Sequence, residues 1–394
     1  MKKYFLLLLY SAVFTSTAQS SSFQITYNGI TPQAKIAIDR AAEIWSSILV
    51  SDVPIKVNVN WINATSLGFL GVSISNGVKD FPNVPYNGVW YPSSLADAIA
   101  GADLNPTETD MDVYLDSSRN WYFGTDGNGP GNHFDLVNVA LHEFGHGLGF
   151  YSIANIDAPG IGSFSLVIDP VTSLLASFPL PNLAGQPLIF DLFVENLQGE
   201  LLVDSNLFLN PSLGLANQFT SNNLFFNGSN AMNAYSNNRP KLYAPGVFSF
   251  GSSILHLDET SFSPHTSDAV MTPFCSPGES NHNPGPVTIG ILQDLGWVVS
   301  STIIEAQSVN KMHDITVFPN PSNGYTKLSY ELAESQHVNI SIYNIQGQKI
   351  STLFDQFMHS GEYDTQIELN HHSGLYFIVL KSLNNKSIAK LLVK

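Results

Sequence analysis

The chain has 394 residues, of which 44% are hydrophobic and 12% charged, so it is long enough for about two or three domains and too apolar for a disordered protein. Its net charge of −16 argues against a nucleic-acid partner, because phosphate binding needs a basic surface. The one cysteine, Cys275, excludes an internal disulfide, so stability must come from core packing and from any bound metal.

The first 18 residues are typical of a signal peptide. Two lysines precede a mostly apolar stretch over residues 4–14, and small residues end at Ala18. The alternative, a membrane anchor, is disfavoured because this stretch is shorter than the roughly 20 residues that span a bilayer. No later stretch is long and apolar enough to span either, so we expect a soluble, exported protein that begins at Gln19.

Residues 19–300 are predicted to form an α+β domain in which strands and a helix precede a second, motif-bearing helix. A short strand over Phe23–Asn28 is followed by a helix, for which Thr31 is the expected N-cap and Pro32 the first residue. Apolar residues then recur at helical spacing as far as Leu49.

The strand Ile55–Trp61 shows strict alternation and is expected to be half buried. Residues Met111–Asp116 predict another strand, and Asp135 is the expected N-cap of a helix that runs towards Phe150. Residues 152–255, rich in Asn, Ser, Leu, Phe and Pro, predict a large insertion of loops and short strands.

After the insertion, a short helix over Pro286–Leu295 is expected to end at Gly296. Residues 19–310 carry seven basic and 25 acidic residues, whereas residues 311–394 carry seven of each. This shift in charge predicts a linker over residues 301–312 and a separate domain over 313–394. About seven short alternating strands in that domain predict a small all-β, Ig-like sandwich.

A helix carrying His142, Glu143 and His146 can form half of a metal site. Residues four apart share one helix face, so both imidazoles can point a nitrogen at one ion, with Glu143 close to a water beside it. This is the arrangement of zinc peptidases. The alternative is a pair of ordinary histidines with no metal role.

A catalytic zinc usually has three protein ligands. In the longer pattern of some zinc peptidases a glycine follows the second histidine and a third histidine follows the glycine. Here Gly149 occupies the glycine position, and Ser152, a poor zinc ligand, occupies the next. The site is therefore either incomplete or completed from far along the chain, where His256, His265 and His282 are available.

The segments GSSILHLDE, DAVMTPF and TIGILQDLGW resemble the end of a leishmanolysin-type metzincin domain, and the resemblance covers residues 23–298. In that family a large insertion also separates the glycine from the third histidine. The resemblance implies a twisted sheet with an active-site helix and zinc ligands His142, His146 and His256, with His265 as the second choice for the third. It also implies Glu143 as general base and Met271 as the hydrophobic floor of the site.

The chain departs from this family in two respects: it has no disulfides, and Cys275 lies downstream of the motif, where it cannot act as an inhibitory propeptide thiol. No tyrosine is identified as stabilising the transition state, and Tyr151 and Tyr243 are the candidates. Metzincins lay an extended substrate along a sheet edge, which the resemblance places at Met111–Asp116.

Calcium is a second possible ion. The carboxylates of Asp110, Asp112, Asp116 and Asp126 are of the type that binds it, although solvated turns and strand ends explain them more simply.

The segments VFPNPSNG, IYNIQGQKI and GLYFIVL resemble a type IX secretion sorting domain over residues 314–394. The resemblance implies engagement with outer-membrane secretion machinery and a secreted or cell-surface location in a Gram-negative bacterium. The alternative is an Ig-like adhesion or sugar-binding module.

The whole sequence therefore predicts a secreted zinc-dependent endopeptidase of protein or peptide substrates, with no nucleic-acid partner and no transmembrane anchor. Two alternatives remain open: a surface binding or adhesion protein on a decayed peptidase scaffold, and a zinc hydrolase of a non-peptide substrate.

Overall fold

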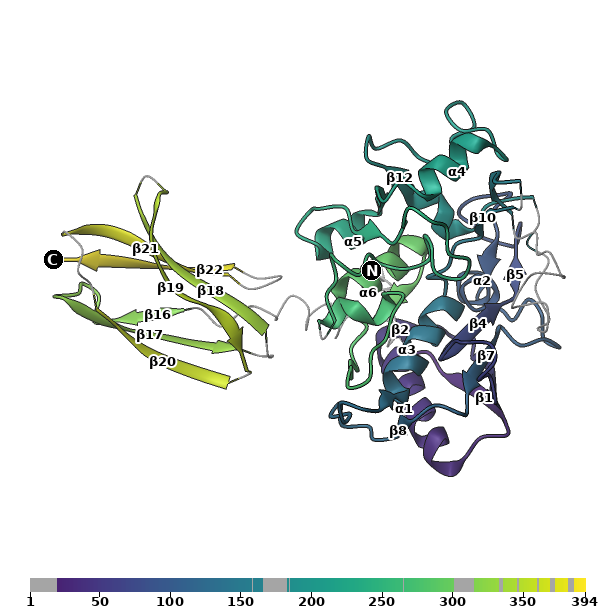
Figure 1. The fold of residues 1–394 in the computed structure, drawn as a ribbon, viewed down its shortest axis with the longest axis horizontal. Helices are drawn as coiled ribbons and strands as arrows, with labels where there is room; N and C mark the ends of the chain where they lie inside the picture. The colour runs from purple at the N-terminus through teal and green to yellow at the C-terminus, as the bar shows by residue number, and fades with distance from the viewer. Residues whose placement is uncertain are drawn as a thin grey trace, which may run out of the picture.

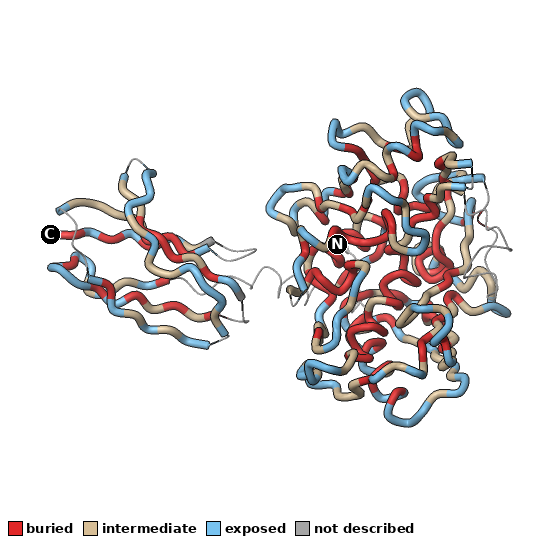
Figure 2. The backbone as a smooth tube through the Cα atoms, in the orientation of Figure 1, coloured by how far each residue is buried: buried red, intermediate tan, exposed pale blue. Residues whose placement is uncertain are grey.

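The structure, a computed structural model, describes residues 20–157, 159–165, 183, 185–264, 266–300, 315–332, 336–345, 347–359, 361–368, 373–381 and 386–394. The predicted signal peptide, the predicted linker over 301–312 and His265 lie outside these residues. Two large hydrophobic cores are separate: one is built from residues 34–299, the other from residues 315–393. Figure 1 shows the elements in chain order, and Figure 2 shows where their buried residues lie.

The part of the chain that contains the first core, residues 20–300, is called the first body. Its main sheet has four strands in the order β1 (Phe23–Asn28), β3 (Ile55–Ile62), β7 (Met111–Asp116) and β4 (Gly71–Ser75). Strands β1, β3 and β7 run parallel to one another, and β4 is antiparallel to β7. In β3, Ile55, Val57 and Val59 are buried at alternate positions, as the period-two pattern predicted, whereas Trp61 at the end of the strand is only partly buried.

The expectation that Met111–Asp116 forms the sheet edge is wrong. This strand, β7, lies between β3 and β4, and β4 is the edge strand on that side. Alternation reports which face of a strand is buried but not which strands flank it, so the sequence alone could not place β7.

Two helices pack together on one face of this sheet. Helix α1 (Pro32–Ile48) begins as predicted, with the Thr31 hydroxyl accepting the Ala34 N–H at 3.2 Å and Pro32 at its first position. Helix α3 (Leu136–Gly147) also begins as predicted, since the Asp135 carboxylate accepts the Asn138 N–H at 3.0 Å. The Trp45 indole of α1 donates to the Leu141 carbonyl of α3 at 3.0 Å and joins the two helices.

The insertion contains β10 (Ala154–Ile156), β11 (Gly162–Phe164), η2 (Ile189–Phe193), β12 (Val194–Asn196), α4 (Leu213–Phe219), β13 (Leu224–Phe226), α5 (Ser229–Ala234) and β14 (Lys241–Leu242). Helices α4 and α5 were not predicted, because seven and six residues are too few to show a helical period. Phe190 packs on Phe150 at 5.3 Å and on Phe226 at 5.2 Å between ring centroids. The insertion therefore shares the core of the first body.

The remaining elements of this body are β2 (Leu49–Val50) paired with β15 (Val298–Val299), β5 (Gly77–Val78) paired with β6 (Tyr91–Pro92), α2 (Ser93–Ala100), β8 (Trp121–Tyr122) paired with β9 (Phe134–Asp135), η3 (Ser267–Met271) and α6 (Pro286–Leu295). Helix α6 ends at Gly296, whose φ of +123° matches its predicted role. The Trp297 indole then donates to the Leu148 carbonyl at the end of α3 at 2.7 Å. The closing segment thus packs against the motif helix.

The tail forms two sheets around its own core, as predicted. One sheet has the order β16 (Thr316–Phe318), β17 (Tyr325–Leu332), β20 (Gly361–Glu368), and the other β19 (Lys349–Met358), β18 (Gln336–Asn344), β21 (Gly374–Lys381), β22 (Lys386–Val393). In the part of the chain that the structure describes, no helix has the length and hydrophobicity needed to cross a bilayer.

Candidate metal centre

The three predicted histidines meet at one point. His142 and His146, one turn apart on α3, place their Nε2 atoms 2.9 Å from each other. His256 comes from a segment 110 residues further along the chain, and its Nε2 lies 3.2 Å from both. Among the described residues, this is the one group of three or more ligand-type side chains close enough to share an ion.

The hydrogen bonds made by the three Nδ1 atoms show that each Nε2 atom has a lone pair available for an ion. The Nδ1 of His142 donates to the Val270 carbonyl at 2.6 Å, that of His146 to the Phe150 carbonyl at 2.6 Å, and that of His256 to the Ser252 carbonyl at 2.8 Å. A neutral imidazole has one N–H, so each Nε2 carries a lone pair. Three lone pairs without a hydrogen between them repel each other, and a cation at their centre removes that repulsion.

The spacing of these nitrogens suits a small tetrahedral ion. Ligand nitrogens about 2.0–2.1 Å from zinc stand roughly 3.3 Å apart on a tetrahedron, against the observed 2.9–3.2 Å. Burial lowers the pKa of His142 to about 4 and that of His146 to about 3. Both rings are therefore neutral at physiological pH, which is the form that binds metal.

Glu143 lies beside this group and is 4% exposed. A side chain at Gly71, on the edge strand β4, would place its Cβ 2.5 Å from Glu143 Oε1, so a larger residue there would displace the carboxylate from its present position. Burial raises the pKa of Glu143 to about 8, as expected for a carboxyl poised to exchange a proton near neutrality.

Met271 lies beneath the motif helix and is fully buried. A Cβ at Gly145 would come within 2.6 Å of the Met271 Sδ, so the thioether packs against the helix between the two helical histidines. The Val270 carbonyl that accepts from His142 belongs to the same short helix, η3. The segment around Met271 therefore packs against the helix that carries His142 and His146 and accepts a hydrogen bond from His142.

Gly149 turns the chain out of α3, with a φ of +122° that other residues rarely adopt. The turn brings the Phe150 carbonyl back to His146. Ser152, at the position where a third histidine was considered, donates its hydroxyl to the buried Asp191 carboxylate at 2.6 Å. The Ser152 side chain is therefore hydrogen-bonded to a residue of η2, in the insertion.

His256 directly follows the insertion. The Tyr243 N–H donates to the His256 carbonyl at 2.9 Å, and the Leu257 N–H donates to the Met271 carbonyl at 2.8 Å. Two residues before His256, Ile254 has a φ of +76° and is fully buried. A β-branched residue rarely adopts this conformation, so the surrounding packing must hold the turn that directs His256 inwards.

The acidic residues considered for calcium have protein partners in different places. Asp110 accepts the Lys56 N–H at 2.7 Å, and Asp112 accepts from the Asn58 amide at 2.7 Å. Asp116 pairs with Arg119 at 2.7 Å. Asp126 accepts the Tyr122 hydroxyl at 2.5 Å. They do not join a ligand group within the described residues, and calcium binding remains a prediction without support.

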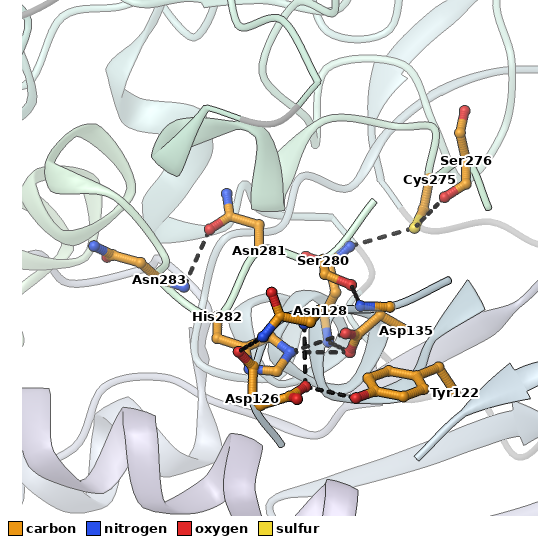
Figure 3. A network of polar contacts seen from close by, with 12 residues as sticks. Tyr122, Asp126, Asn128, Asp135, Cys275, Ser276, Ser280, Asn281, His282 and Asn283 are labelled. Carbon is orange, nitrogen blue, oxygen red and sulfur yellow. Dashed lines mark hydrogen bonds and ion pairs between the residues drawn. The ribbon is translucent and has the colours of Figure 1, made fainter. Parts of the chain in front are cut away.

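His282, one of the three histidines considered for the third position, does not join this group, and Figure 3 shows the contact it makes. Its Nε2 lies 3.0 Å from each carboxylate oxygen of Asp135, the N-cap of α3. His282 is thus a structural partner of the motif helix and lies apart from the three ligands. Gly71 was also missed, because a glycine in a strand carries no signal of the side chain it makes room for.

Comparison with known families matches two parts of the chain. Residues 13–244 match the family described as SPBPB7E8-like, and residues 316–394 match the secretion system C-terminal sorting domain. The second match confirms the predicted type IX sorting tail. A sorting domain of this kind implies that the protein is secreted or displayed at the cell surface of a Gram-negative bacterium.

No curated protein matches the chain. Among solved structures, the crystal structure of dimeric latent PorU from Porphyromonas gingivalis is similar at 16% identity, over 20% of this chain and 9% of that one, with a TM-score of 0.17. The match spans a small part of each chain, and a likeness this slight supports no conclusion about fold or function.

Proposed function

The chain belongs to the SPBPB7E8-like family, and from its three-histidine centre we propose that it is a secreted, zinc-dependent endopeptidase of metzincin type. The observation that carries the proposal is the convergence of three neutral Nε2 lone pairs beside a buried carboxylate. His142, His146 and His256 would hold the ion, and Glu143 would act on water next to it.

Zinc suits this set of ligands best, because three imidazoles leave a fourth tetrahedral position open, as in catalytic zinc sites. When bound, the ion would supply positive charge that polarises a carbonyl and lowers the pKa of water. The backbone carbonyls that accept from each Nδ1 fix the tautomers and orient the rings.

Glu143 is the group that moves the proton. As the water oxygen forms a bond to the peptide carbonyl carbon, the Glu143 carboxylate takes a proton from that water. It then gives the proton to the amide nitrogen as the carbon–nitrogen bond breaks, so that the products are a carboxylic acid and an amine. Burial raises the pKa of Glu143 and so makes its carboxylate a stronger base, and a cation bound beside it would favour the carboxylate form that the first step needs.

The edge strand β4 supports a peptide as the substrate. Gly71 of β4 lies against Glu143, and β4 pairs on one side only, with β7, among the described strands. An extended peptide can add to such an edge through backbone hydrogen bonds. We propose that it lies there, with its scissile bond at Glu143.

The sorting tail bears on where the protein is delivered. We propose that it engages the outer-membrane secretion machinery, which delivers the peptidase to the cell surface or the medium. A secreted peptidase would meet extracellular proteins, and these would be its substrates.

Metal analysis and proteolysis test the proposal together. The purified protein should contain about one zinc per chain and cleave casein, and a chelator should abolish cleavage until zinc is restored. Glu143→Gln should keep the zinc and lose cleavage by at least about 10²-fold, the usual contribution of a general base. Hydrolysis that survives in Glu143→Gln, or a protein that takes up no metal, would contradict the proposal.

A further inference from the structure

One face of the motif helix lies along a single later part of the chain, residues 266–282. Positions three or four apart share a face of a helix, and the N-cap of α3 and three positions within it contact this segment at that spacing. From the N-cap onwards, the contacting pairs are Asp135 with His282, Asn138 with Cys275, His142 with Val270, and Gly145 with Met271. From Val270 to His282 the chain therefore passes along α3 towards the start of the helix.

The two ends of this row of contacts join a candidate metal ligand to the N-cap. At one end, the Val270 carbonyl accepts from Nδ1 of His142 at 2.6 Å. At the other end, His282 Nε2 lies 3.0 Å from each carboxylate oxygen of Asp135, as Figure 3 shows. The Asp135 side chain is fully buried, so its carboxylate depends on protein donors, which are His282 and the Asn138 N–H.

Asn281 closes the 266–282 segment on itself. Its side-chain amide donates to the carbonyls of Thr266 and Ser267, to the second at 2.9 Å. Ser267 is the first residue of η3, the short helix that carries the Val270 carbonyl. A loop whose ends are held together is a compact unit. The contact at His282 therefore helps to fix where the Val270 carbonyl lies.

The loop that precedes α3 contacts the same segment through its backbone. The Gly278 N–H donates to the His133 carbonyl at 2.8 Å, and the Gly129 N–H donates to the Ser280 hydroxyl at 3.0 Å. The His133 side chain instead contacts Asn132 at 2.7 Å. A substitution of the His133 side chain therefore leaves the row of contacts along α3 unchanged.

We propose that His282 and Asn281 are positioning residues that fix the orientation of the His142 imidazole and thereby strengthen metal binding. The inference rests on the proposed function, because it takes His142 as a ligand of the zinc ion. His282 lies outside the ligand group. It acts through Asp135 at the start of α3, and Asn281 acts through η3, so together they hold the helix and the Val270 carbonyl in register.

The other two ligands do not depend on this segment. The Nδ1 atom of His146 donates to the Phe150 carbonyl, and that of His256 donates to the Ser252 carbonyl. Both acceptors lie outside residues 266–282. Loss of the contact at His282 should therefore disturb His142 selectively.

The first test measures zinc affinity by competition with a chromophoric chelator. His282→Leu removes the donor to Asp135, whereas His282→Gln keeps an uncharged N–H donor on a side chain of similar reach. Asn281→Ser opens the loop, and His133→Leu is the matched control. We expect His282→Leu and Asn281→Ser to weaken zinc binding about tenfold, the lower end of the range for residues that support metal ligands, and the other two variants to stay within about threefold of the unaltered protein.

The second test follows exchange of the imidazole Nδ1 hydrogens with solvent, by NMR of the zinc-loaded protein with labelled histidines. In His282→Leu the Nδ1 hydrogen of His142 should exchange faster, while those of His146 and His256 should exchange at unchanged rates. A general loss of stability would accelerate all three. A selective change at His142 therefore distinguishes positioning from a merely structural role.

The outcomes separate this inference from the proposed function. Zinc affinity of His282→Leu within about twofold of the unaltered protein would overturn the inference, and so would equal acceleration at all three imidazoles. If His282→Leu does not fold, Asn281→Ser decides by the same two measurements. If the unaltered protein binds zinc and cleaves no peptide, the proposed function falls, and the zinc measurements still decide the inference. If it binds no zinc, both fall.

Discussion

Burial of neutral histidines at the candidate metal centre should appear as a pH-dependent free energy of unfolding. In the metal-free protein His146 is 7% exposed, and burial lowers its pKa to about 3, from 6.5 for an ordinary histidine. Below pH 6.5 the unfolded chain binds a proton at this residue and the folded chain does not, so acid favours unfolding. Each pH unit between about 6.5 and 4 therefore costs the folded state about 1.4 kcal/mol at His146 alone.

The pH dependence of the unaltered protein will not isolate this effect. Burial raises the pKa of Glu143 to about 8 and that of Asp191 to about 7. A carboxyl group with a raised pKa makes the folded state less stable as pH rises, which is the opposite sign. The contributions partly cancel, and only a difference between two proteins that share these carboxyl groups can separate them.

The assay is urea unfolding with a chelator present, for the unaltered protein and for His146→Gln, at pH 7.5, 6.5, 5.5 and 4.5. The substituted side chain keeps an amide donor that can reach the Phe150 carbonyl, and it has no charge to gain. We expect the variant to gain about 1.4 kcal/mol relative to the unaltered protein for each pH unit below about 6.5. A difference that stays constant across this range would show that His146 titrates normally, and the buried, neutral ligand set would have to be abandoned.

Three further substitutions test the surroundings of the site. Gly145→Ala should push the buried Met271 thioether away from the helix, at a packing cost of about 1–3 kcal/mol that is offset by the roughly 1 kcal/mol which alanine gains over glycine inside a helix, so the net loss of unfolding free energy should be at most about 2 kcal/mol; Gly131→Ala, which meets nothing within 4 Å, should change it by less than about 0.5 kcal/mol. Gly149→Ala, at a φ of +122°, should cost about 1–3 kcal/mol in the same urea assay and weaken zinc binding, and an unchanged denaturation midpoint would contradict this. Asp110→Asn should remove the penalty of ionising a buried carboxyl whose pKa is raised to about 7. It should therefore be more stable than the unaltered protein at pH 8, by roughly 1–4 kcal/mol, and this advantage should vanish by pH 4; equal stability at both pH values would refute the assignment.

The sequence determined the parts of this protein that depend on neighbouring residues. Thr31 and Asp135 cap helices because a short side chain can reach an N–H two or three residues on. His142 and His146 share a face because of the helical period, and alternation predicted β3 and the strands of the sorting tail. Resemblance, rather than spacing, pointed to His256 and Met271.

Only the tertiary structure decided how distant segments meet. It placed β4 rather than β7 at the sheet edge and brought the Nε2 atom of His256 to 3.2 Å from those of His142 and His146, which lie more than 100 residues away in the sequence. The turn that directs His256 runs through Ile254, a residue whose own preference opposes a positive φ. Packing of the insertion against the core imposes that turn. This packing energy is the sum of many contacts between residues that are distant in the sequence, so a local sequence pattern cannot predict it.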